Sequence, residues 1–514
     1  MADEQTRGLF QGALRRDGTV GPDVEQEPVV VGSLTDTRVF QVADALLGPA
    51  YEPGGPLEIT VKDGIISVIR PLEEPSSGPR LLAMPALADA HNHARPLSTT
   101  SFGCGLKPLE TWLPSLAAMP SVDPYLATAA AFGRSVRGGC VGAMAHLTRP
   151  MGLTSLTEEA KEIARAASDA GLAIGLAIAI RDRNPLVYGD HEPLLSGLPQ
   201  EIQSLVRQTW LSTPKSPVDQ IALVDAVADT VGDIPGVDVQ YGPNGVQWCT
   251  DAFLTAIAEA SERNNRRVHM HLLETMPQRH WADQAYPQGI VRHLADIGLL
   301  SPRLTLAHCV WARPEELDLI AEHGARISVN PSSNLHLASG IAPVAGMKKA
   351  GVAFAMGLDG CAFDEDDDAL RELRLFRLLN AGWGFTEDLT PGDALRAACS
   401  TGRAAMGLAK GGTIEVGQPA DLMFLDLEAL DRDGLMPVDP RQYLFARATQ
   451  DHIVELVSGG RTLLQNGKLT GLDLEAVETE LRAQYRAALP TTEDARKAFS
   501  AIEPHVADFY KGCC

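Results

Sequence analysis

The stretch Val268-His269-Met270-His271-Leu272-Leu273-Glu274 is the starting point for interpreting the chain. It begins as a short apolar strand and ends in a histidine, which a glutamate follows three residues later. Other short apolar segments of the chain also end in a histidine or an aspartate. In a barrel of parallel strands, such residues gather at the carboxyl ends of the strands. The stretch therefore predicts one strand of a parallel sheet with a functional site at its carboxyl end.

Short apolar segments alternate with amphipathic patterns through the middle of the chain. Helices are predicted at 155–170, 252–264 and 314–323. Strands are predicted at 82–90, 139–145, 172–180, 237–241, 268–271, 304–308, 326–330 and 352–358. Strands that are apolar throughout and alternate with helices indicate a parallel sheet covered by helices. About eight such units close a barrel, so the predicted fold class is α/β, a (β/α)8 barrel of the TIM type.

The two ends of the chain have a different pattern of polar and apolar residues. Residues 1–27 are polar and predict a loosely held N-terminal extension. Segments 28–80 and 410–470 hold short alternating strands with glycine turns, and predict one small β-sandwich domain built from both chain ends. The barrel would occupy 81–409, and 471–514 predicts a C-terminal helical tail on the outside.

One segment inside the barrel is hard to interpret. Residues 182–236 carry several turn signals and predict a long loop after the third strand, of the kind that shapes a pocket.

Composition narrows the classes of partner. A net charge of −22 over 514 residues argues against nucleic acid and anionic membranes. It says little about a small-molecule substrate, which is expected from the site described below. No apolar run approaches the ~20 residues that a membrane-spanning helix needs. Eight cysteines without a CxxC pair favour a reduced, cytoplasmic protein. Cys513-Cys514 offers a lipidation or redox site, but a frayed tail is the favoured interpretation.

Four residues form a candidate metal site. His91 and His93 are two apart, so on a strand both side chains point to the same side. His271 and Asp359 end two later strands of the predicted barrel. Three imidazoles and a carboxylate suit a divalent transition metal, with zinc preferred and iron, manganese or cobalt as alternatives. His269 faces the same way as His271 and is a rival ligand.

Further residues would carry out the chemistry beside the metal. Glu274 is placed to carry protons, and His308 to orient water or polarise a substrate. Asp359 would act as a catalytic base as well as a ligand. His146 is a candidate for lining the pocket, with a structural role equally open.

A second metal would need a bridging anion, usually a carbamylated lysine. The lysines between His146 and His269 are Lys161 and Lys215, and neither ends a strand. One metal ion per chain is therefore predicted.

Taken together, these motifs resemble the amidohydrolase superfamily from about residue 29 to 468. The motifs are Pro85-Ala-Leu-Ala-Asp-Ala-His91-Asn-His93, His269-Met-His271-Leu-Leu-Glu274, Ala307-His308-Cys-Val-Trp311, Asn330-Pro-Ser-Ser-Asn-Leu-His-Leu-Ala-Ser-Gly340, Leu358-Asp359-Gly360 and Glu415-Val-Gly-Gln-Pro-Ala-Asp421. The chain is most similar to the branch of cytosine and guanine deaminases and triazine hydrolases. That resemblance implies a single zinc or iron on His91, His93, His271 and Asp359. It also implies a proton shuttle at Glu274, and a water or substrate partner at His308.

The predicted function is a hydrolase that attacks a C–N bond with metal-activated water, most simply the deamination of an aminated nitrogen heterocycle. An amide, urea or carbamate hydrolase with the same ion is the alternative, and a catalytically inactive structural relative is a remote one. The acidic residues Asp364, Glu365 and Asp366 hint at a cationic group on the substrate, although a solvated loop is favoured. By analogy with similar proteins, a homo-oligomer (a dimer or larger) is expected.

Overall fold

The computed structural model describes residues 37–73, 77–360, 365–408 and 410–511. The predicted extension 1–27, Cys513-Cys514 and Asp364 lie outside these ranges. No helix in the described parts of the chain is long and apolar enough to cross a lipid bilayer.

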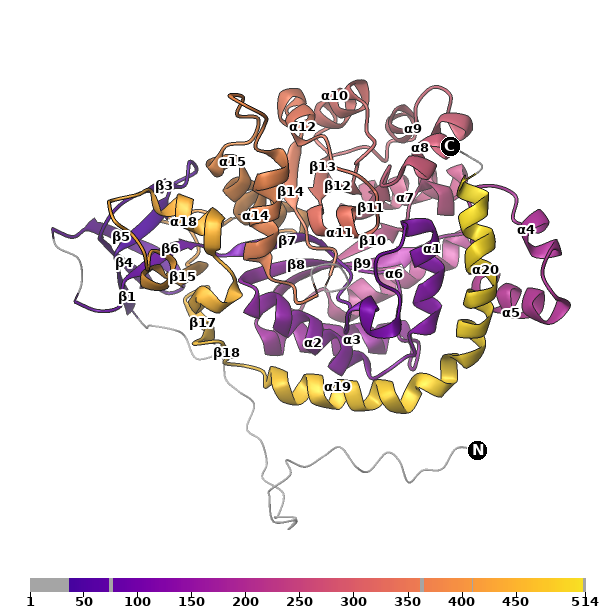
Figure 1. Ribbon diagram of the computed structural model, residues 1–514, viewed down its shortest axis with the longest axis horizontal. Coiled ribbons are helices and arrows are strands. Elements are labelled where there is room, and N and C mark those ends of the chain that lie inside the picture. The colour runs from indigo at the N-terminus through magenta and orange to yellow at the C-terminus, as the bar shows by residue number, and fades with distance from the viewer. Residues whose placement is uncertain (1–36, 74–76, 361–364, 409, 512–514) are drawn as a thin grey trace, which may run out of the picture. The chain divides into compact units, whose positions relative to one another are not determined.

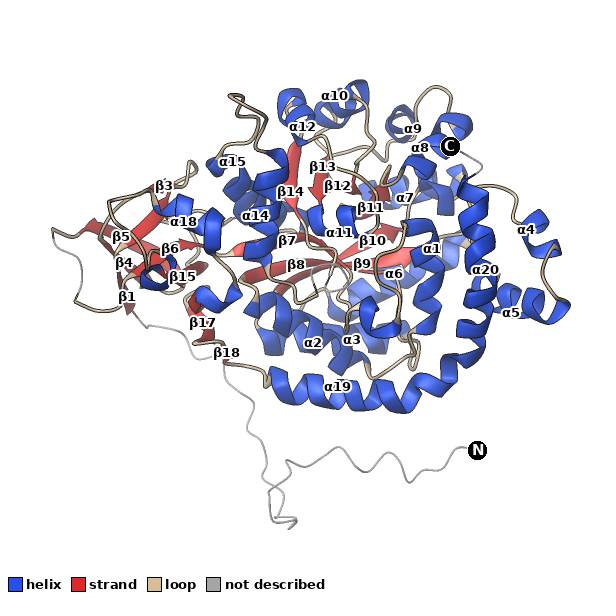
Figure 2. Ribbon diagram, viewed as in Figure 1, coloured by secondary structure: helices blue, strands red, loops and turns tan. Residues whose placement is uncertain are grey.

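Eight parallel strands form the central sheet, and each pairs with the next one along the chain (Figure 2). They are β7 (Leu87–Asn92), β8 (Cys140–Leu147), β9 (Ala173–Ile180), β10 (Val237–Pro243), β11 (Val268–Leu272), β12 (Leu304–His308), β13 (Arg326–Val329) and β14 (Ala353–Met356). First and last strands meet where the backbone N–H of Asp359 donates to the carbonyl of His91 at 2.7 Å. The predicted (β/α)8 barrel is confirmed.

Helices separate the strands where the sequence predicts them. The three expected helices are α3 (Leu156–Ala170), α7 (Asp251–Asn264) and α10 (Pro314–Glu322). The Ser155 side chain begins α3 by accepting from the backbone N–H of Glu158, and Ile163 and Ala167 are buried on one face of that helix. The other helices around the barrel are α1 (Leu109–Ser115), α2 (Pro124–Arg137), α8 (Met276–Ala285), α9 (Ile290–Asp296), α11 (Pro331–His336), α12 (Val344–Ala350), α14 (Ala369–Asn380), α15 (Pro391–Arg396) and α16 (Gly402–Ala405).

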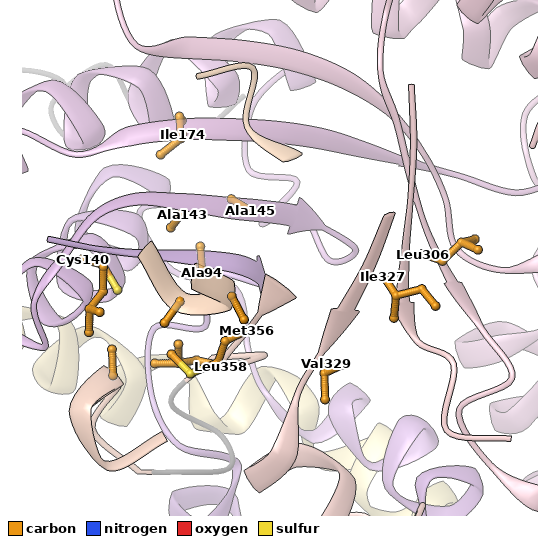
Figure 3. Close-up of a cluster of buried hydrophobic side chains, with 14 of the residues drawn as sticks. Ala94, Cys140, Ala143, Ala145, Ile174, Leu306, Ile327, Val329, Met356 and Leu358 are labelled. Carbon is orange, nitrogen blue, oxygen red and sulfur yellow. The ribbon is translucent and has the colours of Figure 1, made fainter. Parts of the chain in front are cut away.

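Strands and helices enclose one large apolar core. Figure 3 shows part of it, including Ile174 of β9, Leu306 of β12 and Ile327 of β13, all fully buried. Burying such side chains contributes about 1.5–3 kcal/mol each. The core therefore holds the carboxyl ends of the strands, and the residues attached to them, in fixed positions.

The strand expected at 82–90 is two strands in two different sheets, so that prediction was wrong. The chain forms β6 (Leu81–Pro85), then turns at Ala86, whose N–H donates to the carbonyl of Asp421 at 3.0 Å, and starts β7. Both strands are apolar and buried, so no change in periodicity marks the break.

The segment 182–236 was expected to contain a long loop, but it is largely helical. It holds α4 (Glu192–Ser196), α5 (Gln200–Trp210) and α6 (Pro217–Val231). Proline begins both α4 and α6 within their first two positions, so residues that suggest turns in the sequence are helix starts in the structure.

The chain ends build two further sheets. The larger has the strand order β18-β17-β16-β15-β6-β2-β3 and the smaller β1-β4-β5. Their bounds are β1 (Thr37–Val42), β2 (Asp44–Leu47), β3 (Glu52–Pro53), β4 (Leu57–Lys62), β5 (Ile65–Pro71), β15 (Leu422–Asp426), β16 (Ile453–Ser458), β17 (Arg461–Gln465) and β18 (Lys468–Leu469). Ile59 of β4 and Phe424 of β15 lie in one apolar cluster that joins the two sheets. From this shared cluster we propose that the two chain ends form one small domain, as predicted, with the barrel inserted between its two parts.

Helices complete this end of the molecule. They are α17 (Leu427–Leu430), α18 (Pro440–Arg447), α19 (Leu474–Ala488) and α20 (Glu493–Lys511). α19 packs on α2, and α20 runs beside α1 and α5 (Figure 1).

A buried ion pair joins the barrel to the small sheets, and its loss is expected to be costly. The Asp421 carboxylate accepts from Arg403 at 2.6 Å, from the Ser458 hydroxyl at 2.9 Å and from the Gly459 N–H at 2.8 Å. We expect Asp421→Ala to lower the free energy of unfolding by about 3–5 kcal/mol, because it leaves the Arg403 cation buried without its partner. Urea denaturation measures this. Asp431→Ala removes the more exposed pair with Arg80 and should cost less than about 1 kcal/mol; equal losses in the two variants would contradict the prediction.

Candidate metal centre and active site

The six predicted site residues converge at the carboxyl end of the barrel. His91 lies in β7 and His271 in β11, and His308 ends β12. The closest atoms belong to the predicted ligands. His93 Nε2 lies 3.1 Å from Asp359 Oδ1 and 3.3 Å from His271 Nε2. His91 Nε2 lies 3.4 Å from the same Asp359 oxygen.

Hydrogen bonds fix the rings of two histidines. The Nδ1 of His93 donates to the carbonyl of His146 at 2.8 Å, and the Nδ1 of His271 donates to the carbonyl of Asn244 at 2.8 Å. Since a carbonyl can only accept, the proton lies on Nδ1 and the Nε2 lone pair faces the centre of the cluster. Burial lowers the pKa of His93 to about 4 and that of His271 well below its ordinary value, so both rings are neutral near pH 7. These are the tautomer and charge that metal ligation requires.

The third imidazole is oriented by another histidine. His91 Nδ1 lies 2.8 Å from His269 Nε2, and the two rings stack with centroids 5.0 Å apart. Burial lowers the pKa of His91 to about 3, so it too is neutral. His269, the rival ligand, thus directs its Nε2 at His91 rather than at the cluster. His146 donates from Nε2 to the carbonyl of Gly242 at 3.1 Å and does not line the cavity described below.

Asp359 supplies the carboxylate. Burial acts to raise its pKa, whereas positive charge on the His91 and His93 rings lowers it well below the usual range. A bound metal cation would supply that charge beside neutral rings, and in either case the carboxylate is ionised. Its Oδ2 accepts from the Ser333 hydroxyl at 2.6 Å. Asp359 has φ +63°, and His308 has φ +76°, in the left-handed region that non-glycine residues rarely occupy. Two strained residues in one site are typical of functional positions.

His308 and Glu274 lie beside the ligand cluster. His308 Nδ1 donates to Asn334 Oδ1 at 2.9 Å, and its Nε2 lies 3.7 Å from both Glu274 Oε2 and Asp359 Oδ2. Burial raises the pKa of Glu274 well above its ordinary value, and the nearby carboxyls of Asp359 and Glu110 add to the effect. The pKa of Glu274 is thus raised while that of the neighbouring Asp359 is lowered. A pair of carboxyls with pKa values pushed apart can divide the roles of acid and base.

A metal ion fits this donor set. Two triads bring their ligand atoms within 4.8 Å of one another: His91, His93 and His271, and His91, His308 and Asp359. Two of the atoms at the centre, His91 Nε2 and Asp359 Oδ1, are buried and make no hydrogen bond to any described residue. Buried polar atoms without partners are rare, and nitrogen and oxygen donors of this kind are those of catalytic zinc sites.

A cavity of about 380 Å³ opens above the cluster. His93, His271, Glu274, His308 and Asp359 form its floor. Its walls are largely aromatic and apolar and include Trp112, Tyr188, Trp210, Trp248, Leu337 and Tyr510. Substrates of drug-like size fit cavities of this volume.

Charged residues in the cavity wall were missed by the sequence analysis. Arg149 and Arg181 line it, and the Arg181 guanidinium has no hydrogen-bond partner among the described residues. Glu110 also lines the cavity, and burial raises its pKa. Nothing in their spacing marks these residues, because each lies in a loop or short helix after a strand. The acidic residues Glu365 and Asp366 are bonded to Thr100 and Arg371 instead and do not line the cavity.

Comparison with known proteins agrees with this geometry. The model of the amidohydrolase family matches residues 82–463. A 5′-deoxyadenosine deaminase of Methanosarcina acetivorans is 31% identical over 248 residues, 48% of this chain and 56% of that protein. The chain thus spans about half the length of such curated relatives.

Two weaker similarities cover more of the chain. A 5-methylthioadenosine/S-adenosylhomocysteine deaminase of Syntrophobacter fumaroxidans is 26% identical over 460 residues, 86% of this chain and 95% of that protein. The crystal structure of a Xanthomonas campestris adenosine deaminase with bound zinc has a TM-score of 0.71 at 24% identity, over 88% of this chain and 98% of that one, and shares the fold. With the family match over most of the barrel, these findings confirm the resemblance: the chain belongs to the amidohydrolase family.

Proposed function

We propose that the protein is a hydrolase that deaminates an aminated nitrogen heterocycle with one divalent metal ion, preferably zinc. The observation that carries the proposal is the convergence of His91, His93, His271 and Asp359 on one point at the floor of an aromatic cavity. The relatives named above as deaminases of adenosine derivatives support the substrate class. A planar heterocycle suits walls made of aromatic rings.

Each residue of the site has a place in this proposal. His91, His93, His271 and Asp359 would hold the ion. Such an ion supplies the Lewis acidity that makes water nucleophilic at neutral pH. Asp359, ionised, is the proton acceptor at the floor of the cavity.

The other two residues act on the substrate side. Glu274, whose raised pKa favours the protonated form, donates to the ring nitrogen or to the leaving amine. His308 is held by Asn334. It stabilises the charge that develops on the group bonded to the carbon that water attacks.

An amide, urea or carbamate hydrolase with the same residues remains the alternative, since only the attacked carbon differs. The remote alternative, an inactive relative, would be expected to lack one or more of the six site residues, and all six are present. A homo-oligomer and a cytoplasmic location remain predictions.

The test is ammonia release by the metal-supplemented protein from a panel of aminated purines, pyrimidines, triazines and adenine nucleosides. We expect ammonia from at least one ring amine, at a rate that falls when a chelator removes the metal. Release of an acid and an amine from a linear amide or urea, with no ammonia from any ring, would favour the alternative. No hydrolysis of either kind by metal-loaded protein would overturn the proposal.

A further inference from the structure

Part of the cavity wall comes from chain segments outside the (β/α)8 repeat. Tyr188 and Trp210 belong to the segment after β9, and Tyr510 belongs to α20. The sequence analysis placed the C-terminal tail on the outside of the molecule. α19 packs on α2, whereas α20 reaches the cavity through Tyr510.

The two outer segments form one packed unit. Val187 and Val206 from the segment after β9 share an apolar cluster with Ile502 and Val506 of α20. All four side chains are buried, so the two segments pack directly on each other. Figure 1 shows α20 in yellow passing between α1 and α5.

A hydrogen-bonded series connects this unit to the floor of the cavity. The Tyr510 hydroxyl accepts from the Tyr188 backbone N–H at 2.9 Å. Gln278 donates from Nε2 to the Tyr188 hydroxyl at 3.3 Å, and its Oε1 accepts from the Glu274 backbone N–H at 2.8 Å. Tyr510 thus positions Tyr188, which shares Gln278 with the residue that is proposed to donate the proton.

The indole N–H groups of two aromatic wall residues are already engaged by protein. The Trp210 Nε1 donates to the Pro114 carbonyl at 3.2 Å, and the Trp112 Nε1 donates to the Thr99 hydroxyl at 3.3 Å. What these two residues offer to a ligand is therefore ring surface, and Tyr188 offers its ring beside a hydroxyl that accepts from Gln278. Tyr188 also meets Tyr510 edge to face, with ring centroids 5.7 Å apart.

We propose that the segment after β9 and α20 together form a distal subsite, which binds an apolar or aromatic substituent carried by the heterocycle. Tyr510 is a positioning residue of this subsite, and Tyr188 forms its wall. The identity of the ring rests on the proposed function. The subsite adds a second element of substrate recognition, because it binds the substituent that the ring carries. It predicts preference for substituted rings over bare rings.

The test compares rings with and without one benzyl group. Purine, pyrimidine and 1,3,5-triazine, each bare and benzylated, are titrated against the metal-loaded full chain, with the fluorescence of the cavity tryptophans as the signal. The corresponding amines are assayed for ammonia. We expect at least one benzylated ring to bind about tenfold more tightly than its bare form, the scale of discrimination that an apolar pocket provides.

Variants assign that preference to the subsite. Tyr510→Ala and Tyr188→Ala should each abolish the preference, so that KM for the substituted amine rises to about that for the bare amine of the same variant. Tyr510→Phe, which loses only the hydroxyl acceptor, should lose part of the preference. Lys497→Ala is the matched control on the same helix, because it removes an exposed pair with Glu201 away from the cavity and should keep the preference in full.

The outcomes separate the two proposals. Absence of a benzyl preference for every ring in the wild type, or a preference that survives both alanine variants, overturns the subsite. A preference that the variants abolish, in a protein that releases no ammonia, retains the subsite and removes the deaminase.

Discussion

His271→Ala is expected to remove both the bound metal and the activity. The wild-type chain should hold about one metal ion after dialysis, and the variant close to none, because His271 Nε2 is one of the donors that converge with His93 and Asp359. Loss of a metal's Lewis acidity removes several kcal/mol of transition-state stabilisation, so kcat/KM should fall about 10³-fold or more. Elemental analysis and the ammonia assay measure the two effects.

A histidine elsewhere on the barrel provides the control. His323 follows α10, and its Nδ1 donates to the Leu319 carbonyl at 2.9 Å, so His323→Ala should keep both the metal and the activity. Two ions per wild-type chain would show that a bridging ligand other than lysine exists. Full metal content in His271→Ala would remove this histidine from the ligand set.

Glu274→Gln should separate catalysis from metal binding. The amide keeps the shape of the side chain but cannot give up a proton, so kcat should fall by about 10²–10⁴-fold while the metal content is unchanged. A variant that also loses its metal would show that Glu274 acts on the ion rather than on the substrate.

The same substitution should not destabilise the protein. Burial raises the pKa of Glu274 in the folded state, so the folded chain binds a proton that the unfolded chain releases above its pKa of about 4.3. The contribution of protonated Glu274 to the free energy of unfolding is fully present below about pH 4.3 and is lost as the pH rises through the folded-state pKa. The neutral amide of the Glu274→Gln variant carries no such dependence. The difference in melting temperature between the variant and the wild type should therefore increase in favour of the variant as the pH rises from about 4.3 toward the folded-state pKa.

Glu316→Gln is expected to have the opposite effects, a loss of stability without a loss of catalysis. This carboxylate is buried against Arg279, with both oxygens 2.9 Å from Nη1, and it lies outside the cavity. Its substitution should lower the melting temperature and leave kcat per folded molecule unchanged. A fall in kcat of similar size in both variants would mean that loss of stability, rather than loss of the proton, explains the effect at Glu274.

The sequence predicts the parts of this protein that have a regular spacing. The barrel is readable because its strands are short, largely apolar runs, and some carry a functional residue at or near their carboxyl end, as His271 does in Val268–Leu272. The six site residues are brought together because parallel strands align their carboxyl ends.

Features set by contacts distant in sequence could not be predicted. Tyr188 and Tyr510 meet only because α20 packs on α5, and no local pattern in either segment encodes that contact. The break between β6 and β7 lies inside one apolar run, since both sheets demand the same kind of residue. The left-handed backbone of His308 and Asp359 is likewise imposed by the surrounding barrel rather than by their own preferences.

The pairing of β6 with β15 has a consequence for the order of folding. These strands are adjacent in the sheet, yet residues 86–421 separate them in the chain. Closing so long a loop from an unfolded chain costs about 5 kcal/mol in entropy. A folded barrel already packs α16 on β7, so it brings the two chain segments close together and removes most of that cost before the strands meet. We therefore expect refolding to be sequential, with the barrel first and the discontinuous sheets assembling on it afterwards.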